Sequence, residues 1–482
     1  MSKSLLDRIK VPHVFTLLTG VVLFCSLLTY LVPSGSYDRE VIQVGSLERN
    51  VIVPDSFERI PKAYSAKGLV FGQSVEGRAA PVSLEGFLSA IPRGMEAAAD
   101  IIFFIFVLGG VFGILQRTGT IIAGLHKLLG RFRDSGPLLT IVLMTSIAIG
   151  GSTLGMGEEF IPLVPLFLLV SKELGYDRIF GLALVMVAAD VGFAAATTNP
   201  FTVNIAQGIA ELPLNSLIPF RLVFLVACLA VTLTYVLRYG ARIKKDPSAS
   251  VMPDDDFDLS HHDYEIEEFN RRHLIILISC VVIFGFILYA IQEMDWWLAE
   301  MGGGFILMAL VAIVVSGLSV MEAARAAVKG MEEMVVAALV VGFARAIQVV
   351  LDDGQILDTL IFSAAGLLQH LPSYLAAAGM LVFQSVLNFF IPSGSGQAAV
   401  TMPLMAPLAD VLGLTRQTAV FAFTCGDGFS NTIVPTSGVL MAMLSLAGIP
   451  WDKWLKFMLP LFLQLMLLAT VFLFIAVAMG LE

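Results

Sequence analysis

The stretch NFFIPSGSGQAAVTMPLMAPLAD, Asn388–Asp410, puts five residues that disfavour a helix interior in the middle of an apolar run. No formally charged side chain occurs between Thr359 and Ala409, yet residues 392–396 read PSGSG. Proline removes an amide donor, and glycine weakens a helix by about 1 kcal/mol. One helix must therefore end here and another begin, which predicts a helical hairpin over residues 373–411. Such a break is tolerated in a membrane where it is buried or lines a wet cavity; a helix contact through small residues is the alternative.

The whole chain has the composition of an integral membrane protein. Of its 482 residues, 57% are hydrophobic and 14% are charged, against about 25% charged in ordinary soluble domains. Charge-free runs such as Val11–Val32, Leu274–Gln292 and Gly303–Met321 approach the ~20 residues that a helix needs to cross a bilayer. The net charge is -10 and the sequence contains no basic stripe, so we exclude nucleic acid as a partner. The four cysteines fall in apolar runs and show no metal-like spacing, so we expect neither a disulfide framework nor a metal site.

The distribution of basic residues orients the chain in the bilayer. Lys3, Arg8 and Lys10 precede the first apolar run, and further Lys and Arg residues flank the segment 241–272. Cytoplasmic loops carry an excess of such residues, so both regions are predicted to be cytoplasmic. Residues 34–96 are then external.

A second hairpin is predicted over residues 137–171. Basic residues at 117–133 and at 172–178 mark two cytoplasmic turns, so the piece between them enters and leaves on the same side. Its apolar arms, 137–150 and 159–171, are about 20 Å long at 1.5 Å per residue, which is too short to cross. We interpret the piece as a re-entrant hairpin with the sequence GGSTLGMGEE at its tip.

The two halves of the chain resemble each other at a nearly constant offset. Short motifs that begin at Thr118 and Asp353, and at Leu174 and Leu412, match at offsets of 235 and 238 residues. Repeats of this kind are typical of transporters. The charge bias makes the second unit start from the opposite face. We therefore expect an all-α polytopic membrane protein with about nine transmembrane helices and two re-entrant hairpins in an inverted repeat.

This interpretation divides the chain into five parts. Short amphipathic segments at 119–131 and 355–370 are expected to lie in the membrane interface. The parts are a first span with an external segment (1–96), inverted repeat 1 with the hairpin 137–171 (97–240), a cytoplasmic linker (241–272), scaffold spans (273–333) and inverted repeat 2 with the hairpin 373–411 (334–482).

Each hairpin is followed by a helix that is itself interrupted. The run 178–196 meets TTNP at 197–200, and the run 417–429 meets SNT at 430–432 and PTS at 435–437. Unwound segments expose helix N-termini, which attract carboxylates, and oxygen atoms, which suit Na⁺. Local capping of a proline kink is the alternative. The predicted substrate-binding residues are Gly157, Glu158, Glu159, Thr197, Thr198, Asn199, Ser393, Gly394, Ser395, Gly396, Gln397, Ser430, Asn431, Thr432, Thr436 and Ser437.

Two aspartates precede the breaks at related positions. Acidic residues at membrane depth are costly and usually functional, so Asp190 and Asp427 are predicted to couple transport to Na⁺ or H⁺, unless one of them pairs with Arg221 or Arg345. These two arginines and Asp100 are expected to snorkel or to pair at the interface. For either glutamate of the first hairpin tip, exposure to cytoplasmic water or capping of the following arm is the alternative. We expect no cofactor.

These motifs resemble the YfcC-like family of bacterial inner-membrane carriers, which is related to the anaerobic four-carbon dicarboxylate carriers. The resemblance covers nearly the whole chain and rests on GMGEE (155–159), LGYDR (174–178), FIPSGSGQAAVTMPLMAPLAD (390–410) and GDGFSNTIVPTSG (426–438). More distantly, the chain is similar to the ion-transporter superfamily, whose members are dimeric elevator carriers with paired hairpins and Ser-Asn-Thr motifs. The resemblance implies a homodimer in the bacterial inner membrane and an elevator-type mechanism.

We therefore expect a secondary active transporter of a small carboxylate-bearing metabolite, and not an enzyme. Ser, Gly and Gln at one hairpin tip could hold a carboxylate, and the glutamates at the other could hold an ammonium or guanidinium group. This favours an amino acid, in particular a basic one, moved by exchange or ion coupling. A four-carbon dicarboxylate is the alternative substrate. A remote alternative is an intramembrane aspartyl protease, because TCGDGF at 424–429 resembles a Gly-x-Gly-Asp signature, although position 424 is Thr.

Overall fold

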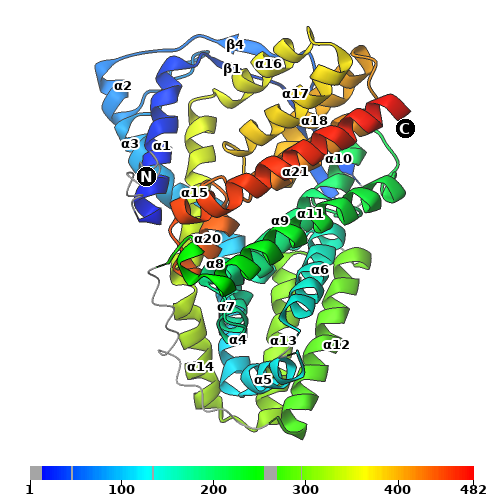
Figure 1. The fold of residues 1–482 in the computed structure, drawn as a ribbon. Helices are drawn as coiled ribbons and strands as arrows, with labels where there is room; N and C mark the ends of the chain where they lie inside the picture. The colour runs from blue at the N-terminus through cyan, green and yellow to red at the C-terminus, as the bar shows by residue number, and fades with distance from the viewer. Residues whose placement is uncertain (1–12, 45–46, 133–134, 254–268, 295, 482) are drawn as a thin grey trace.

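The chain is mostly helical (Figure 1). A computed structural model describes residues 13–44, 47–132, 135–253, 269–294 and 296–481. The regular structure of these residues is helical apart from four short strands, which confirms the predicted α-helical membrane class. The predicted cytoplasmic markers Lys3, Arg8 and Lys10, and residues 254–268 of the predicted linker, lie outside the described residues.

Eight helices in the described part of the chain are long and apolar enough to cross a membrane. They are α1 (Val14–Leu31), α4 (Ala99–Arg117), α6 (Gly136–Leu154), α11 (Ile218–Lys245), α12 (Arg271–Glu293), α13 (Leu298–Ser316), α15 (Val335–Asp353) and α21 (Trp451–Met479). The predicted count of nine spans stays a prediction, because several predicted crossings consist of shorter pieces. The other described helices are α2 (Ala66–Phe71), α3 (Leu84–Ala97), α5 (Thr120–Phe132), α7 (Val164–Glu173), α8 (Arg178–Leu182), α9 (Ala188–Ala194), α10 (Val203–Ile209), α14 (Val320–Glu333), α16 (Leu357–Leu368), α17 (Ser373–Asn388), α18 (Gly394–Val411), α19 (Arg416–Ser430) and α20 (Gly438–Ala447), with the short helical segments η2 (Glu158–Leu163), η3 (Ala183–Val187) and η4 (Pro247–Ala249).

Two pairs of consecutive helices, α3–α4 and α14–α15, form what we call the frame. α3 packs along α15, and α4 packs along α14. The backbones approach closely at glycines: a Cβ on Gly113 would lie 2.3 Å from the carbonyl oxygen of Ala326, and one on Gly94 would lie 2.5 Å from that of Gly342. Small residues allow such close packing between helices in a membrane. The last part of the predicted external segment, Leu84–Ala97, is therefore a helix of this frame instead of a loop.

The hairpin predicted at 373–411 consists of α17 and α18, as expected. The break lies between Asn388 and Gly394, so the last three residues of PSGSG form the first turn of α18 and not a loop. Ser393 caps this turn, since its Oγ accepts a hydrogen bond from the N–H of Gly396. Good capping explains why a helix can begin on a glycine-rich sequence.

The other hairpin has a longer first arm than predicted. α6 contains 19 residues, or about 28 Å at 1.5 Å per residue, and it continues beyond residue 150 to Leu154. Close packing compensates for the low helix propensity of its glycines: a Cβ on Gly151 would lie 2.5 Å from the carbonyl oxygen of Ala189 in α9. The chain turns at residues 155–157 and returns through η2 and α7.

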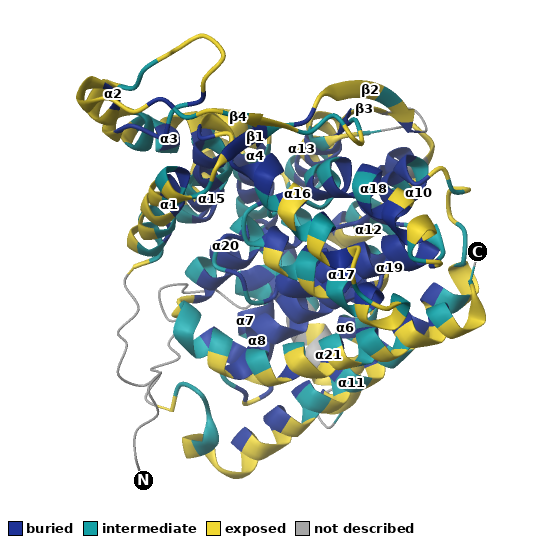
Figure 2. Cartoon of the chain, turned by 90° about the horizontal axis from the view of Figure 1, so that it is seen from above, coloured by how far each residue is buried: buried dark blue, intermediate teal, exposed yellow. Residues whose placement is uncertain are grey.

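Both predicted helix interruptions are confirmed. The helical run from α8 through η3 to α9 ends at Ala194, and α10 follows after residues 195–202, the first break. α19 ends at Ser430, and α20 follows after residues 431–437, the second break. α9 and α19 cross so closely that a Cβ on Gly428 would lie 2.4 Å from the Cα of Ala194. The breaks therefore follow a common crossing in the most buried part of the molecule, where every residue of α19 after its first is buried (Figure 2).

Residues 34–44 and 47–60 form a strap of short strands over one end of the molecule (Figure 2). β1 (Ser34–Ser36) pairs with β4 (Glu58–Ile60), and β2 (Arg39–Val44) pairs with β3 (Leu47–Ile52), both antiparallel. Asp358 in α16 anchors the strap, because its carboxylate accepts a hydrogen bond from the N–H of Tyr37 at 2.9 Å and pairs with Arg39 at 3.0 Å. Burial and this nearby carboxylate raise the pKa of Tyr37 to about 12.

The far end of the strap packs on the second hairpin. β3 lies against α18 and β2 against α10. Val44 is seated on Gly208, where an added Cβ would lie 2.3 Å from its Cγ1. The strap therefore connects α16 to both α18 and α10.

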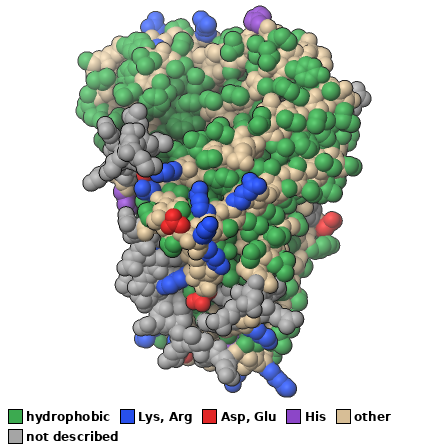
Figure 3. Space-filling model, in the orientation of Figure 1, with side chains coloured by type: hydrophobic (Ala, Val, Ile, Leu, Met, Phe, Trp, Pro, Cys, Tyr) green, Lys and Arg blue, Asp and Glu red, His purple; other side chains and the backbone are tan. Residues whose placement is uncertain are grey.

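The outer surface has an apolar belt with a basic end. Figure 3 shows one face covered mostly by hydrophobic side chains, with Lys and Arg gathered where α11 ends and α21 begins. α11 carries Arg242, Lys244 and Lys245 in its last turn, and Lys453 and Lys456 lie in the first two turns of α21. This clustering is what the positive-inside bias predicts for a cytoplasmic end.

Candidate functional site

A cavity of about 340 Å³ lies where the frame, both hairpin tips and the second break meet. Pockets for small molecules are typically about 300–1,000 Å³ in volume, so this one suits a small metabolite. The predicted site residues that line it are Gly157, Glu158, Glu159, Asp190, Ser393, Gly394, Ser395, Asn431, Thr436 and Ser437.

One part of the cavity lining is acidic. Glu158, Glu159, Asp190 and Asp100 all line it. Asp190 lies within electrostatic range of Glu158, and Glu158 within range of Asp100. Glu159 also accepts a hydrogen bond at 2.9 Å from the backbone N–H two residues earlier, so the capping role considered as an alternative coexists with a place at the cavity. Four carboxyl groups in one part of the lining would attract a positively charged group.

Another part of the lining consists of helix N-termini. α18 begins at Gly394 after Ser393, and α20 begins at Gly438 after Ser437; all four residues line the cavity. Each serine Oγ accepts a hydrogen bond from the N–H three residues later, at 3.3 Å and 3.4 Å respectively. Other N–H groups of a first turn have no acceptor within the helix and carry the positive end of its dipole. These two helix ends can therefore bind an anionic group.

Arg345 of α15 is the single basic residue among those that line the cavity. Arg345 and Asp100 were expected to snorkel or to pair at the interface; both line the cavity between the hairpin tips, where Asp100 is exposed and Arg345 is half-buried. No sequence signal separates an arginine that faces a cavity from one that faces the membrane boundary. Only the packing of α15 against α20 decides it.

A side chain near the end of each hairpin's first helix holds the break that follows. Ser152 donates from Oγ to the carbonyl oxygen of Ala195 at 2.9 Å and accepts from the N–H of Thr197 at 3.1 Å. Asn388 donates from Nδ2 to the carbonyl oxygen of Asp427 at 2.9 Å. Each contact pairs backbone groups that an interrupted helix would leave free. Neither Ser152 nor Asn388 is among the predicted site residues, although the repeat offset relates them.

Eight predicted site residues do not line the cavity. Thr432 Oγ1 donates to the carbonyl three residues earlier at 2.7 Å, as the local capping alternative expected. Thr198 Oγ1 instead donates to the carbonyl oxygen of Thr153 in the first hairpin at 3.1 Å. Gln397 is buried and donates to Oε1 of Gln384 at 2.7 Å. The eight residues are Thr197, Thr198, Asn199, Gly396, Gln397, Asp427, Ser430 and Thr432.

Asn199 lies behind the first hairpin tip. Gly155 ends α6 with a φ of +69°, and a Cβ on it would lie 2.4 Å from Oδ1 of Asn199. The same Oδ1 accepts a hydrogen bond from the N–H of Phe201 at 2.9 Å. Asn199 therefore shapes the turn that carries the glutamates, and only glycine fits where the two backbones meet.

Asp427 lies behind the cavity at the crossing of α9 and α19. It is fully buried, and neither of its carboxyl oxygens has a hydrogen-bond partner among the described residues. Oδ2 of Asp190 and Oγ1 of Thr202 are also buried without a partner. Gly394 covers this group, since a Cβ on it would lie 3.1 Å from Oδ2 of Asp427 and 2.7 Å from Cγ2 of Thr202.

Side chains from α11 and α21, the long helices that follow the two breaks, also reach them. Trp454 of α21 donates from Nε1 to the carbonyl oxygen of Thr432 at 2.8 Å. Arg221 of α11 donates to the carbonyl oxygen of Ala196 at 3.3 Å and is only 2% exposed. The expectation that Arg221 snorkels is therefore wrong, because a free carbonyl in the buried first break provides its acceptor.

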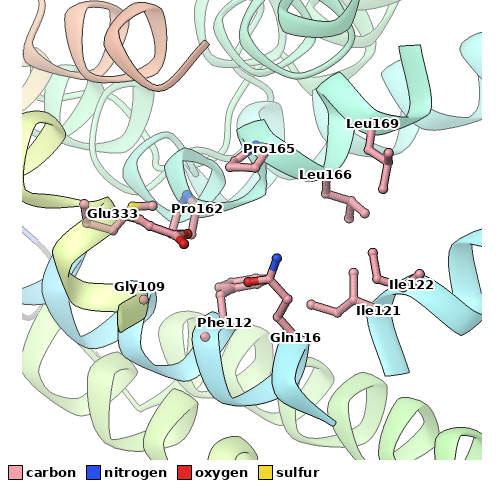
Figure 4. Close-up of a pocket in the computed structure, with 13 residues that line it drawn as sticks. Gly109, Phe112, Gln116, Ile121, Ile122, Pro162, Pro165, Leu166, Leu169 and Glu333 are labelled. Carbon is pink, nitrogen blue, oxygen red and sulfur yellow. The ribbon is translucent and has the colours of Figure 1, made fainter. Parts of the chain in front are cut away.

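A second, smaller cavity of about 50 Å³ separates the frame from the first hairpin. Figure 4 shows Pro162, Pro165 and Leu166 on the hairpin side, and Phe112 and Gln116 on α4. Its size suits a few water molecules at most. The larger cavity is therefore the candidate binding site.

The sequence comparisons point to membrane carriers. The family model described as C4-dicarboxylate anaerobic carrier (DcuC) matches residues 11–478. The chain is 34% identical over 472 residues, 93% of each chain, to an Escherichia coli K12 protein with the printed name "Putative basic amino acid antiporter YfcC". It is 29% identical over 499 residues, 97% of each chain, to an uncharacterized protein of Haemophilus influenzae.

Two solved transporter structures are similar at a lower level. The YdaH transporter of Alcanivorax borkumensis aligns with 97% of this chain and 99% of its own, at 16% identity and a TM-score of 0.43. MtrF of Neisseria gonorrhoeae, whose title describes a class of antimetabolite efflux pumps, aligns with 97% of this chain and 96% of its own, at 16% identity and a TM-score of 0.42.

Proposed function

Because this chain belongs to the C4-dicarboxylate anaerobic carrier family, a family of membrane transporters, we propose that it is a secondary active transporter of a small amino acid, in particular a basic one. The multi-pass architecture places it in the bacterial inner membrane. The substrate would cross the membrane by exchange or by coupling to an ion gradient.

The polarity of the larger cavity carries this proposal. Glu158, Glu159 and Asp190 supply negative charge from the first hairpin and α9, whereas α18 and α20 supply two helix N-termini. An amino acid presents both an ammonium group and a carboxylate, so it can satisfy both parts of the lining at once. A basic side chain adds a second cation for the remaining carboxyl groups.

A four-carbon dicarboxylate is the second candidate, and the description of the family favours it. Two helix N-termini could each hold one carboxylate of such a substrate. However, the dicarboxylate would also meet the carboxyl groups of Asp100, Glu158, Glu159 and Asp190, with Arg345 as the single basic side chain in the lining. Unless most of those groups were protonated, like-charge repulsion would oppose binding.

Asp190 and Asp427 are proposed to couple transport to Na⁺ or H⁺. Both are buried, both have carboxyl oxygens without partners among the described residues, and they lie within electrostatic range of each other. Unpaired buried carboxylates are costly, so they are expected to bind a cation or a proton in some state of the cycle. Asp190 lines the cavity, which would let substrate and coupling ion influence each other.

An inverted repeat that works as an elevator is the proposed architecture. In each half, a hairpin is followed by a broken helix, and Ser152 and Asn388 hold the two breaks from matching positions. The frame is likewise built from two helix pairs that pack reciprocally. These features support two related units. In an elevator, the hairpins and broken helices of both units would move together past the frame. A homodimer would provide the frame with a fixed base.

Flux into proteoliposomes tests the proposal directly. Purified protein is reconstituted and supplied with labelled arginine, ornithine, aspartate or succinate, with and without a Na⁺ or pH gradient. Saturable arginine or ornithine flux is expected, with weaker flux of aspartate and succinate. Saturable succinate flux without any amino-acid flux would establish the dicarboxylate alternative instead.

A further inference from the structure

We propose that Arg345, together with the first turn of α20, is the receptor for the substrate's carboxylate. This inference rests on the proposed function and adds to it a requirement: the transported molecule must carry a carboxylate beside its cationic groups. It assigns a role to a side chain that the sequence motifs do not include.

The contact between α15 and α20 places Arg345 near the N-terminus of α20. A Cβ on Gly438, the first residue of α20, would lie 3.2 Å from the Cα of Val341 in α15. Val341 and Arg345 are four residues apart on one helix and therefore lie on the same face, and both line the cavity. The Cα–Cβ bonds of a helix tilt toward its N-terminus, which for Arg345 is the direction of Val341 and Gly438.

Two polar side chains at this corner, Arg345 and Thr436, have no hydrogen-bond partner among the described residues. Arg345 makes no hydrogen bond or ion pair with any other described residue, although Asp352 of the same helix lies within electrostatic range of it. Thr436 lines the cavity and is buried from the outer surface. Its Oγ1 has no hydrogen-bond partner among the described residues. The first N–H groups of α20 have no acceptor within the helix. A guanidinium, a hydroxyl and a helix N-terminus therefore converge on one place, and together they match the donor pattern that a carboxylate requires.

The rest of the lining argues against the view that Arg345 only neutralises the carboxyl groups of the cavity. The hairpin glutamates and Asp190 belong to the first hairpin and α9, whereas Arg345 belongs to the frame. If Arg345 served only to neutralise those carboxyl groups, an ion pair between them would be expected, and no described residue pairs with it. A zwitterionic substrate would bridge the two instead, with its carboxylate at Arg345 and its cationic groups at the acids.

Decarboxylated substrates give the sharpest test. Arginine and agmatine share the guanidinium end and differ by the carboxylate, as do lysine and cadaverine. In proteoliposomes, wild-type protein is expected to prefer arginine over agmatine by about ten-fold or more in kcat/KM, the scale of one charge-assisted contact. Arg345→Gln is expected to remove most of this preference by raising KM for arginine while leaving agmatine flux nearly unchanged. Arg345→Lys should retain part of the preference.

Two further variants separate a binding role from a general defect. Arg325→Gln alters an exposed arginine of α14 outside the cavity and should behave as wild type. Thr436→Val removes one hydroxyl with little change in volume and should reduce the arginine preference in the same direction. If Arg345→Gln does not fold, the preference measured for Thr436→Val and Arg345→Lys decides the question.

The failures of the inference and of the proposed function are distinguishable. Arginine flux in wild type together with an unchanged arginine-to-agmatine ratio in the Arg345 and Thr436 variants would overturn the inference alone. Equal flux of arginine and agmatine in wild type would also overturn it. The absence of flux for every amino acid in wild type would overturn the proposed function and, with it, this inference.

Discussion

Ser152 and Asn388 occupy the same structural position in the two halves of the chain. Each ends or nearly ends the first helix of a hairpin, and each bonds the backbone where the next helix breaks: Ser152 at the carbonyl of Ala195, Asn388 at the carbonyl of Asp427. Asn388 also donates to Oγ of Ser430 at 2.8 Å. Each hairpin is therefore hydrogen-bonded to the break that follows it. A movement of one would displace the other, together with any solute bound there.

Removing the amide of Asn388 should destabilise the protein markedly. Asn388→Leu removes the buried amide that donates to the carbonyl of Asp427, to Oγ of Ser430 and to Oδ1 of Asn431, at a cost of about 1–3 kcal/mol for each group left unsatisfied. Thermal unfolding of the purified protein should show a clearly lower Tm. Ser385→Ala on the same helix is the control, because Ser385 Oγ bonds only weak or local partners, including a carbonyl of its own helix at 3.0 Å. Equal Tm values for the two variants would contradict the role assigned to Asn388.

The crossing of α9 and α19 should tolerate no side chain at Gly428. Gly428→Ala forces its Cβ to within 2.4 Å of Ala194, and such overpacking typically costs about 1–3 kcal/mol. Gly285→Ala is the matched control in α12, since nothing lies within 4 Å of an added Cβ there. We expect the first variant to lower Tm and to reduce flux, and the second to keep or slightly raise Tm because alanine favours a helix. A Tm for Gly428→Ala at or above that of Gly285→Ala would show that the crossing is looser than described.

The proposed coupling role of Asp427 predicts a selective loss. Asp427→Asn removes the buried charge while keeping its size, so accumulation driven by a Na⁺ or pH gradient should fall by about ten-fold or more. Exchange of labelled for unlabelled substrate without a gradient should survive better. Asp410→Asn is the control, because Asp410 pairs with Arg416 at an exposed position.

The same pair of variants addresses the aspartyl-protease alternative. Peptide cleavage by the wild type that disappears in Asp427→Asn, together with an absence of flux in both, would favour an enzyme. Gradient-driven flux that is unaffected in Asp427→Asn would remove Asp427 from the coupling mechanism.

The strap should loosen when Asp358 loses its charge. Asp358→Asn weakens the ion pair with Arg39, in which the Asp358 side chain is 6% exposed, so part of the strap's anchoring energy is lost. Limited proteolysis of the purified protein should cut within residues 39–52 several times faster than in the wild type. Asp38→Asn, at an exposed neighbouring position, should leave the rate unchanged. Identical cleavage in all three proteins would indicate that strand pairing alone holds the strap.

The sequence by itself determined the membrane class, the hairpin at 373–411 and both helix breaks. Their signals are local: an apolar run has a length, and proline or glycine stops a helix wherever the chain goes next. The same local rules misjudged α6, because its glycines remain helical where α9 packs against them.

Only the tertiary structure decided which polar residues face the cavity. A threonine or asparagine in a break can bond either the local backbone or a solute. The choice depends on which backbone groups of the break already have partners from distant helices. Ser152, Trp454 and Arg221 reach the breaks from other helices and satisfy particular backbone groups. Arg345 lies at the cavity because α15 packs against α20. These two helices are nearly a hundred residues apart in the chain, so the residues around Arg345 do not predict this contact.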